Sequence, residues 1–174
     1  MYRIAIAGPE STGKSELAIA LAKHFGAVFV PEFARSYIET LNRPYGYDDV
    51  CAIATKQIQE LKEFENLNAA PFVFYDTELI ITKIWFAYRY QTVPHFLETQ
   101  LQKKNYDFYL LCYPDLEWIP DSVREHGGQE RMMLYELYKS EIEKSCIPFA
   151  IIKGLHANRM NNAIQALEIQ FAKT

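Results

Sequence analysis

Eight residues near the N-terminus have the types and spacing of a phosphate-binding loop. The segment Gly8-Pro-Glu-Ser-Thr-Gly-Lys-Ser15 reads G-x-x-x-x-G-K-S and follows an apolar run at 4–7. Its two glycines allow backbone conformations in which successive N–H groups turn toward a polyphosphate. The lysine would reach the β- and γ-phosphates, and the last serine would complete the coordination of Mg²⁺. A chance match at four specified positions arises in roughly one chain in a hundred of this size. The residues expected to bind ATP in this loop are Gly8, Glu10, Ser11, Thr12, Gly13, Lys14 and Ser15.

An acidic residue, Asp76, ends a second apolar run that begins at Phe72. In P-loop proteins a carboxylate at this place lies beside the loop and holds Mg²⁺, directly or through water. Asp76 and Ser15 are therefore the expected metal ligands. In a simpler interpretation Asp76 only caps a helix that starts near Glu78, and the two roles are compatible.

Three further residues are candidates for binding a second substrate. Glu32 and Arg35 follow a short apolar run at 27–30, and ligands of open α/β sheets bind beyond the carboxyl ends of strands. The alternative is a surface carboxylate and a surface guanidinium at the start of a helix. Trp85 belongs to an aromatic-rich helical segment and, like Tyr88 in the same segment, is a candidate for stacking on a flat substrate ring, although most aromatic side chains at helical spacing belong to the core.

A polar segment at about 115–131 carries Arg124 and Arg131 on either side of a Gly-Gly pair. We expect a lid that closes on phosphates, with both arginines neutralising developing charge; the alternative is an irregular surface loop. Lys14, Asp76 and these two arginines are the expected catalytic residues.

The turn after the last expected strand, at 154–159, lies where many P-loop proteins hold the adenine ring. Arg159 is the candidate for a nucleotide contact there.

The elements that must position these residues alternate between short apolar runs and helical patterns. Strands are expected at 2–7, 27–30, in the run that ends at Asp76, at 106–113 and at 149–152. Helices are expected at 15–25, about 50–66, 77–90, after Pro94, at about 129–144 and at the C-terminus. Asp48 or Asp49 is expected to cap the second of these helices. This alternation predicts an α/β, three-layer P-loop NTPase fold: a five-stranded parallel sheet with helices on both faces and a small lid.

Composition is that of one soluble globular domain spanning all 174 residues. The net charge of −4 argues against a nucleic-acid partner, which would require a basic face. No apolar run approaches the ~18 residues of a membrane span, and the N-terminus enters a strand almost at once, so we expect no signal peptide and a cytoplasmic protein. Three widely spaced cysteines predict reduced thiols.

Several classes of P-loop protein do not fit the other motifs. The sequence has no Asn-Lys-x-Asp for guanine, and Asp76-Thr-Glu-Leu differs from the Asp-x-x-Gly of regulatory GTPases. Motor-type ATPases have a glutamate directly after this aspartate, where the chain has Thr77. A basic lid late in a short chain favours a small-molecule kinase.

Four motifs together resemble the ribosylnicotinamide kinase domain of NadR-type proteins. They are the P-loop, Glu32-Phe-Ala-Arg35, Asp76-Thr77 and Asp115-x-x-Trp118-x-x-Asp121-x-x-Arg124, in the family's order and over essentially the whole chain. The resemblance implies ATP- and Mg²⁺-dependent phosphorylation of nicotinamide riboside to nicotinamide mononucleotide. It implies that Asp76 serves the metal or the acceptor hydroxyl, and that Glu32 and Arg35 line the acceptor pocket.

Two departures from the family pattern leave alternatives open. The chain has no His-x-Gly-His motif for adenylyl transfer, and Pro31 stands where an aromatic residue would stack on the pyridinium. The aromatic residues that could take over that role are Phe33, Tyr37, Tyr47 and Trp85. A kinase for another nucleoside-like acceptor, or an ATP-hydrolysing switch that signals to a protein partner, are the competing hypotheses; the oligomeric state is not predicted.

Overall fold

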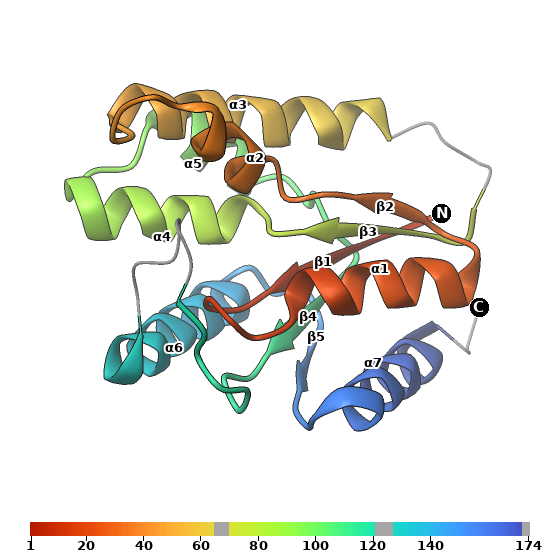
Figure 1. Ribbon diagram of the computed structural model, residues 1–174. Coiled ribbons are helices and arrows are strands. Elements are labelled where there is room, and N and C mark those ends of the chain that lie inside the picture. Colours follow the sequence, from red (N-terminus) through yellow and green to blue (C-terminus); the bar gives the residue numbers. More distant parts are fainter. Residues whose placement is uncertain (65–69, 121–126, 172–174) are drawn as a thin grey trace.

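A five-stranded parallel sheet forms the centre of the protein in a computed structural model that describes residues 1–64, 70–120 and 127–171 (Figure 1). The strands are β1 (Tyr2–Ala7), β2 (Val28–Val30), β3 (Phe72–Asp76), β4 (Phe108–Cys112) and β5 (Phe149–Ile152). Their spatial order is β2-β3-β1-β4-β5, and every neighbouring pair is parallel. The predicted sheet is confirmed, with β1 at its middle.

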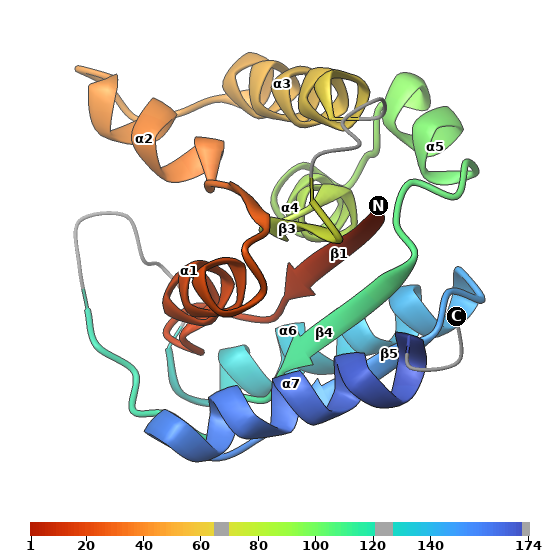
Figure 2. The same ribbon diagram turned by 90° about the vertical axis from the view of Figure 1, so that its right-hand side faces the viewer.

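Helices cover both faces of the sheet, as the alternating sequence pattern predicts (Figure 2). The helices are α1 (Lys14–Phe25), α2 (Phe33–Thr40), α3 (Tyr47–Glu63), α4 (Leu79–Tyr90), α5 (His95–Leu101), α6 (Gly128–Lys144) and α7 (His156–Phe171). Helices α1 and α7 pack on one face, and α3, α4 and α6 pack on the other.

The two faces of the sheet bury separate hydrophobic cores because successive residues of a strand point to opposite sides. In β1, Ala5 and Ala7 belong to the core under α3, α4 and α6, whereas Ile4 and Ile6 belong to the core under α1 and α7. All four side chains are fully buried. The central strand therefore reads as a continuous apolar run rather than as an alternating one.

Helix boundaries differ from the sequence expectation where side chains cap backbone groups. Helix α3 begins at Tyr47 rather than near residue 50. Its N-cap residue is Gly46, and Asp49, in the first turn of the helix, accepts a hydrogen bond from the Gly46 N–H at 2.7 Å. Asp49 therefore caps this end of the helix, but from inside its first turn and not from the position before it. Helix α4 begins at Leu79 and is capped by the buried Glu78 carboxylate, which accepts from the N–H groups of Ile80 and Ile81.

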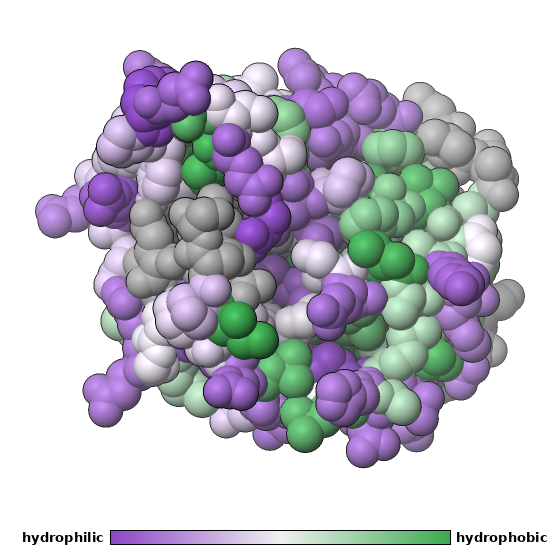
Figure 3. All heavy atoms as spheres, in the orientation of Figure 1, coloured by the Kyte–Doolittle hydropathy of each residue, from purple (hydrophilic) through white to green (hydrophobic). Residues whose placement is uncertain are grey.

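The surface in the orientation of Figure 1 is mostly polar, with apolar side chains gathered on the right-hand side (Figure 3). Within residues 1–64, 70–120 and 127–171, no helix is long and apolar enough to cross a membrane.

Candidate nucleotide and acceptor site

The loop between β1 and α1 has the backbone geometry that its glycines predict. Gly8 and Gly13 have φ of 143° and 71°, and a Cβ on Gly8 would lie 2.8 Å from the Cys112 carbonyl oxygen. Ser11 also has a positive φ, 54°. Gly13 is the N-cap of α1, and no side chain caps this end, so the first N–H groups of the helix point toward the loop. This end of a helix favours a phosphate group.

Two side chains of the loop meet at one backbone carbonyl. Lys14 Nζ donates to the Pro9 carbonyl oxygen at 2.9 Å, and Thr12 Oγ1 donates to the same oxygen at 2.8 Å. Thr12 is fully buried, so its hydroxyl shapes the loop from inside, while Lys14 lines the adjacent cavity. Lys14 is therefore held at the wall of that cavity, close to the loop backbone.

Asp76 lies directly beside the end of β1, because β3 pairs with β1 in the register Ile6↔Asp76. One carboxylate oxygen of Asp76, Oδ1, is buried and has no hydrogen-bond partner within the described part of the chain. Burial raises the pKa of Asp76, while the nearby Ser15 hydroxyl and the Lys14 charge oppose that increase. A buried oxygen of this kind beside a serine hydroxyl fits a hard divalent cation such as Mg²⁺.

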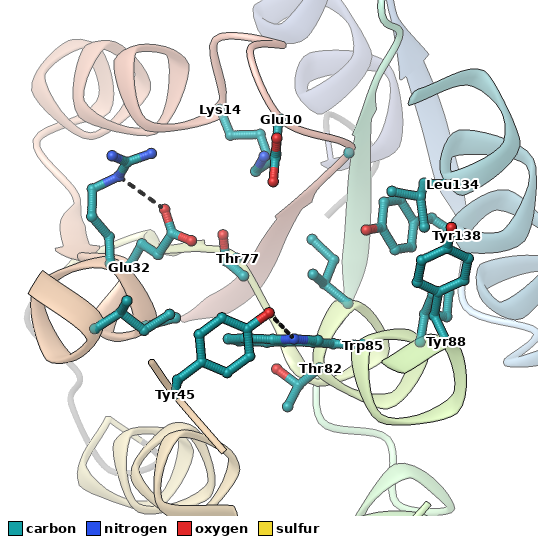
Figure 4. A pocket seen from close by; sticks show the side chains of 16 residues that line it. Glu10, Lys14, Glu32, Tyr45, Thr77, Thr82, Trp85, Tyr88, Leu134 and Tyr138 are labelled. Carbon is teal, nitrogen blue, oxygen red and sulfur yellow. Dashed lines mark hydrogen bonds and ion pairs between the residues drawn. The ribbon is translucent and has the colours of Figure 1, made fainter. Parts of the chain in front are cut away.

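Glu32 and Arg35 stand at the start of α2, just beyond β2, as the sequence predicts. Glu32 Oε2 lies 3.9 Å from Arg35 Nε, and Arg35 Nη1 lies 3.9 Å from Glu39 Oε1. Burial raises the pKa of Glu32; Lys14 and Arg35 lower it, and the neighbouring Asp76 charge raises it further. Figure 4 shows that the Glu32 carboxylate points toward the cavity beside Thr77.

One cavity joins the P-loop to these carboxylates and to a group of aromatic side chains (Figure 4). Trp85 from α4 lies opposite Lys14 and Glu32 across it. Tyr45, from the segment between α2 and α3, contacts Trp85 edge to face at 5.1 Å between ring centroids. The remaining wall is mostly apolar and aromatic, with the polar side chains of Glu10, Thr77 and Thr82 among the residues Ile38, Ile81, Ile84, Tyr88, Leu134 and Tyr138.

Sequence reasoning missed Tyr45, which lies in a turn-rich stretch with no periodic pattern. Of the aromatic residues considered for stacking, Trp85 and Tyr88 line this cavity. Phe33 and Tyr37 pack on each other at α2, and Tyr47 packs against Phe86 in the core. For a side chain in a segment without helix or strand, no sequence pattern predicts which element it will contact.

Arg131, in the first turn of α6, is buried against the P-loop. Its Nη2 donates to the Ser11 carbonyl oxygen at 3.1 Å, and its Nη1 donates to the Leu116 carbonyl oxygen at 3.0 Å. It therefore joins the segment after β4 to the loop. Arg124, the other arginine predicted for a lid, lies outside the described residues.

The segment 116–119 lies along the outside of the P-loop. Trp118 Nε1 is 3.5 Å from Glu10 Oε2, and the Ile119 N–H donates to Ser11 Oγ at 3.2 Å. A Cβ on Gly13 would lie 3.1 Å from the Leu116 side chain. Residues 116–119 of the expected lid are thus in contact with the loop.

Arg159 is buried and bonded to protein groups at the ends of β4 and β5. Its guanidinium donates to the carbonyl oxygens of Gly154, Ile152 and Tyr113, and it pairs with the Asp115 carboxylate. Asp115 in turn accepts from the Gly154 N–H at 2.7 Å. Arg159 therefore shapes the turn after β5; its predicted contact with the nucleotide stays a prediction.

Comparison with known proteins places this geometry in a family. Residues 3–159 match the family described as AAA domain. The chain belongs to that family. It is also 26% identical, over 156 residues, to the trifunctional NAD biosynthesis/regulator protein NadR of Salmonella typhimurium and to that of Escherichia coli. The alignment covers 86% of this chain and 38% of each relative, so the chain spans about two fifths of their length.

Solved structures show the same resemblance. A NadR protein in complex with NR superposes with a TM-score of 0.77 at 25% identity, over 98% of this chain and 52% of that one. Deoxyadenosine kinase from M. mycoides with bound dATP superposes with a TM-score of 0.62 at 16% identity, over 97% of this chain and 100% of that one, which shows the fold. The predicted resemblance to NadR-type proteins and the fold of P-loop kinases are confirmed.

Proposed function

We propose that this protein is an ATP- and Mg²⁺-dependent kinase that phosphorylates the ribose 5′-hydroxyl of nicotinamide riboside to give nicotinamide mononucleotide. One observation carries the proposal: a single cavity is lined by Lys14 of the P-loop, by the Glu32–Arg35 pair and by the Trp85 ring. An acceptor stacked on that ring would present its hydroxyl close to the end of the phosphate-binding loop. Catalysis of phosphoryl transfer consists mainly of such positioning and of charge neutralisation.

The P-loop N–H groups and Lys14 would bind the ATP phosphates. Ser15 and Asp76 would hold Mg²⁺, which would neutralise charge on the phosphates when bound. The acceptor oxygen would attack the γ-phosphorus, the bond from that phosphorus to the bridging oxygen would break, and ADP would leave. The charges of Lys14 and Arg35 lower the pKa of both Glu32 and Asp76.

The hydroxyl proton needs an acceptor, and Glu32 is the better placed of the two carboxylates. Glu32 lines the cavity and points into it, whereas Asp76 is not among the residues that line it. Glu32 also has a raised pKa, which suits a group that takes up a proton during the reaction.

Nicotinamide riboside as the acceptor is supported by the relatives and by the chemistry of the cavity. The relatives are named for NAD biosynthesis, and one solved NadR protein contains NR. A flat pyridinium cation is attracted to the face of an indole ring and to a nearby carboxylate, and both Trp85 and Glu32 line the cavity.

The test is ADP release from Mg·ATP, with and without nicotinamide riboside and beside other nucleosides, with detection of the phosphorylated product. Stimulation by nicotinamide riboside together with formation of nicotinamide mononucleotide is the expected result. Trp85→Ala should raise the KM of the acceptor about tenfold or more, since base–aromatic stacking contributes ~1–3 kcal/mol. Phe96→Ala, an exposed position outside the cavity, is the matched control.

Two outcomes would point elsewhere. Stimulation only by a different nucleoside would keep the mechanism and change the substrate, as the resemblance to deoxyadenosine kinase allows. ATP hydrolysis that no acceptor stimulates would favour a switch that signals to a protein partner.

A further inference from the structure

Tyr45 forms part of the cavity wall although it lies in a segment without helix or strand. This segment, 41–46, connects α2 to α3. Tyr45 Oη accepts a hydrogen bond from Trp85 Nε1 at 3.3 Å, and its ring contacts the indole edge to face. The Arg89 guanidinium carbon lies 5.8 Å from the Tyr45 ring centroid. The orientation of the indole therefore depends on where this segment places Tyr45.

One carboxylate, that of Asp49, ties the segment down on both sides of Tyr45. Arg43 donates through Nη1 to Oδ2 at 2.6 Å and through Nη2 to Oδ1 at 2.8 Å. The Gly46 N–H donates to Oδ2 at 2.7 Å, and Tyr37 Oη donates to Oδ1 at 3.1 Å. Asp49 is 4% exposed, whereas the Arg43 side chain is 58% exposed. A planar, two-point pair between arginine and a carboxylate is among the stronger contacts that a protein makes.

The same four bonds connect α2, the segment 41–46 and α3, and the first two of these line the cavity. Tyr37 belongs to α2, which also carries Arg35 and Ile38 on the cavity wall. Asp49 belongs to α3, which packs against α4, the helix that carries Trp85. Loss of the Asp49 carboxylate would release Tyr45, and with it the indole.

From this arrangement we infer that Tyr45 is a specificity-determining residue for the acceptor, and that Asp49 is a positioning residue that acts through Tyr45. The inference rests on the proposed function, because it concerns the acceptor side of the same cavity. Tyr45 and Trp85 together form a right-angled aromatic corner in which a flat ring can stack on the indole. Asp49 makes no contact with the cavity and contributes only by holding that corner.

The first experiment measures the corner itself and does not depend on the substrate. Trp85 is one of two tryptophans, so acrylamide quenching of its fluorescence is read in a Trp118→Phe background. Asp49→Asn should raise the quenching constant of Trp85 at least about twofold. The asparagine amide presents an N–H₂ donor to the Arg43 guanidinium, which is also a donor, so the hydrogen bonds that hold the segment 41–46 are lost. Asp48→Asn, an exposed neighbour with the same change in charge, should leave it unchanged. An unchanged quenching constant in Asp49→Asn would overturn the inference, whatever the acceptor proves to be.

The second experiment measures the effect on the reaction. Asp49→Asn should raise the KM of the acceptor about tenfold while kcat and the KM of ATP stay within about twofold. Tyr45→Ala should do the same, and Tyr45→Phe, which removes only the hydroxyl that accepts from Trp85, should have a smaller effect. In the Tyr45→Ala protein, Asp49→Asn should add little further loss, since two residues that act as a unit are not additive.

Additive losses in the double variant would show that Asp49 does not act through Tyr45. A parallel increase in the KM of ATP would show a general structural defect and would also overturn the inference. If no acceptor stimulates the wild-type protein, the proposed function fails. The quenching experiment still decides whether Asp49 holds Tyr45 and Trp85 in place.

Discussion

The guanidinium of Arg131 donates a hydrogen bond to the carbonyl oxygen of Ser11, at 3.1 Å from Nη2. The sequence placed this arginine in a lid, acting on the transferred phosphate. In the structure it is buried, and it joins the P-loop to the Leu116 carbonyl. A residue that holds the phosphate-binding loop should affect nucleotide binding as well as turnover.

Replacement of Arg131 by alanine should raise the KM of ATP and lower the melting temperature. The change leaves two backbone carbonyls without a donor, which costs about 1–3 kcal/mol when such groups are buried. Arg131→Lys should give an intermediate effect, because an ammonium cannot reproduce the two directions of the guanidinium fork. Steady-state kinetics and thermal unfolding are the measurements.

The matched control for Arg131 is Lys139→Ala, on the same helix, where the lysine makes an exposed pair with Glu143. That variant should behave as the wild type. If Arg131→Ala lowers kcat but leaves the KM of ATP unchanged, the arginine acts on the transferred phosphate, as the sequence had predicted.

Asp76 and Ser15 should determine the magnesium requirement. Asp76→Asn keeps the size of the side chain but removes the negative charge of the carboxylate, whose Oδ1 has no hydrogen-bond partner among the described residues. We therefore expect kcat to fall at least about a hundredfold. Ser15→Ala should raise the Mg²⁺ concentration needed for half-maximal rate. The measurement is the reaction rate as a function of Mg²⁺ concentration at a constant ATP concentration. If both variants depend on Mg²⁺ as the wild type does, these residues do not belong to the metal site.

Glu32 should set the acidic limb of the pH–rate profile. Its pKa is raised above 4.5, chiefly by burial, and the reaction needs the charged form to accept a proton. Activity should therefore decline as the pH falls through a value above that of an ordinary glutamate. Glu32→Gln should lower kcat and flatten this limb while the KM of ATP is kept; Glu98→Gln, at an exposed position that does not line the cavity, is the control. An acidic limb that is unchanged in Glu32→Gln would assign the proton to another group.

Asp49 should make the stability of the protein depend on acidic pH. Hydrogen bonds from Arg43 and from the Gly46 N–H hold its pKa well below the ordinary 3.8. A carboxylate with a lowered pKa in the folded state contributes stability above pH ~4, and this contribution is lost as the pH falls toward the folded pKa. The difference in free energy of unfolding between wild type and Asp49→Asn should therefore be largest near neutral pH and should narrow below pH 4. Urea unfolding at several pH values measures it, and a difference that does not vary with pH would contradict the assignment.

Much of the architecture follows from local sequence. The spacing of Gly8, Gly13 and Lys14 predicts the loop, because only glycine adopts some of its backbone angles at low cost. Five apolar runs predict the parallel sheet, and Asp76 at the end of one of them predicts its place beside the loop, as the pairing with Ile6 shows. These features depend on residues that are neighbours in sequence, or on the fact that the carboxyl ends of parallel strands lie at the same edge of the sheet.

Tertiary structure alone decided which distant side chains meet. Tyr45 accepts a hydrogen bond from Trp85, and Asp49 accepts hydrogen bonds from Arg43, Gly46 and Tyr37. No repeating pattern in the sequence predicts these contacts. Arg131 reaches Ser11 across 120 residues of chain, so its role depends on how α6 docks beside the loop. Local residue types determine backbone conformation and strand burial, whereas contacts between separate elements arise from the packing of the whole domain, which a linear pattern does not encode.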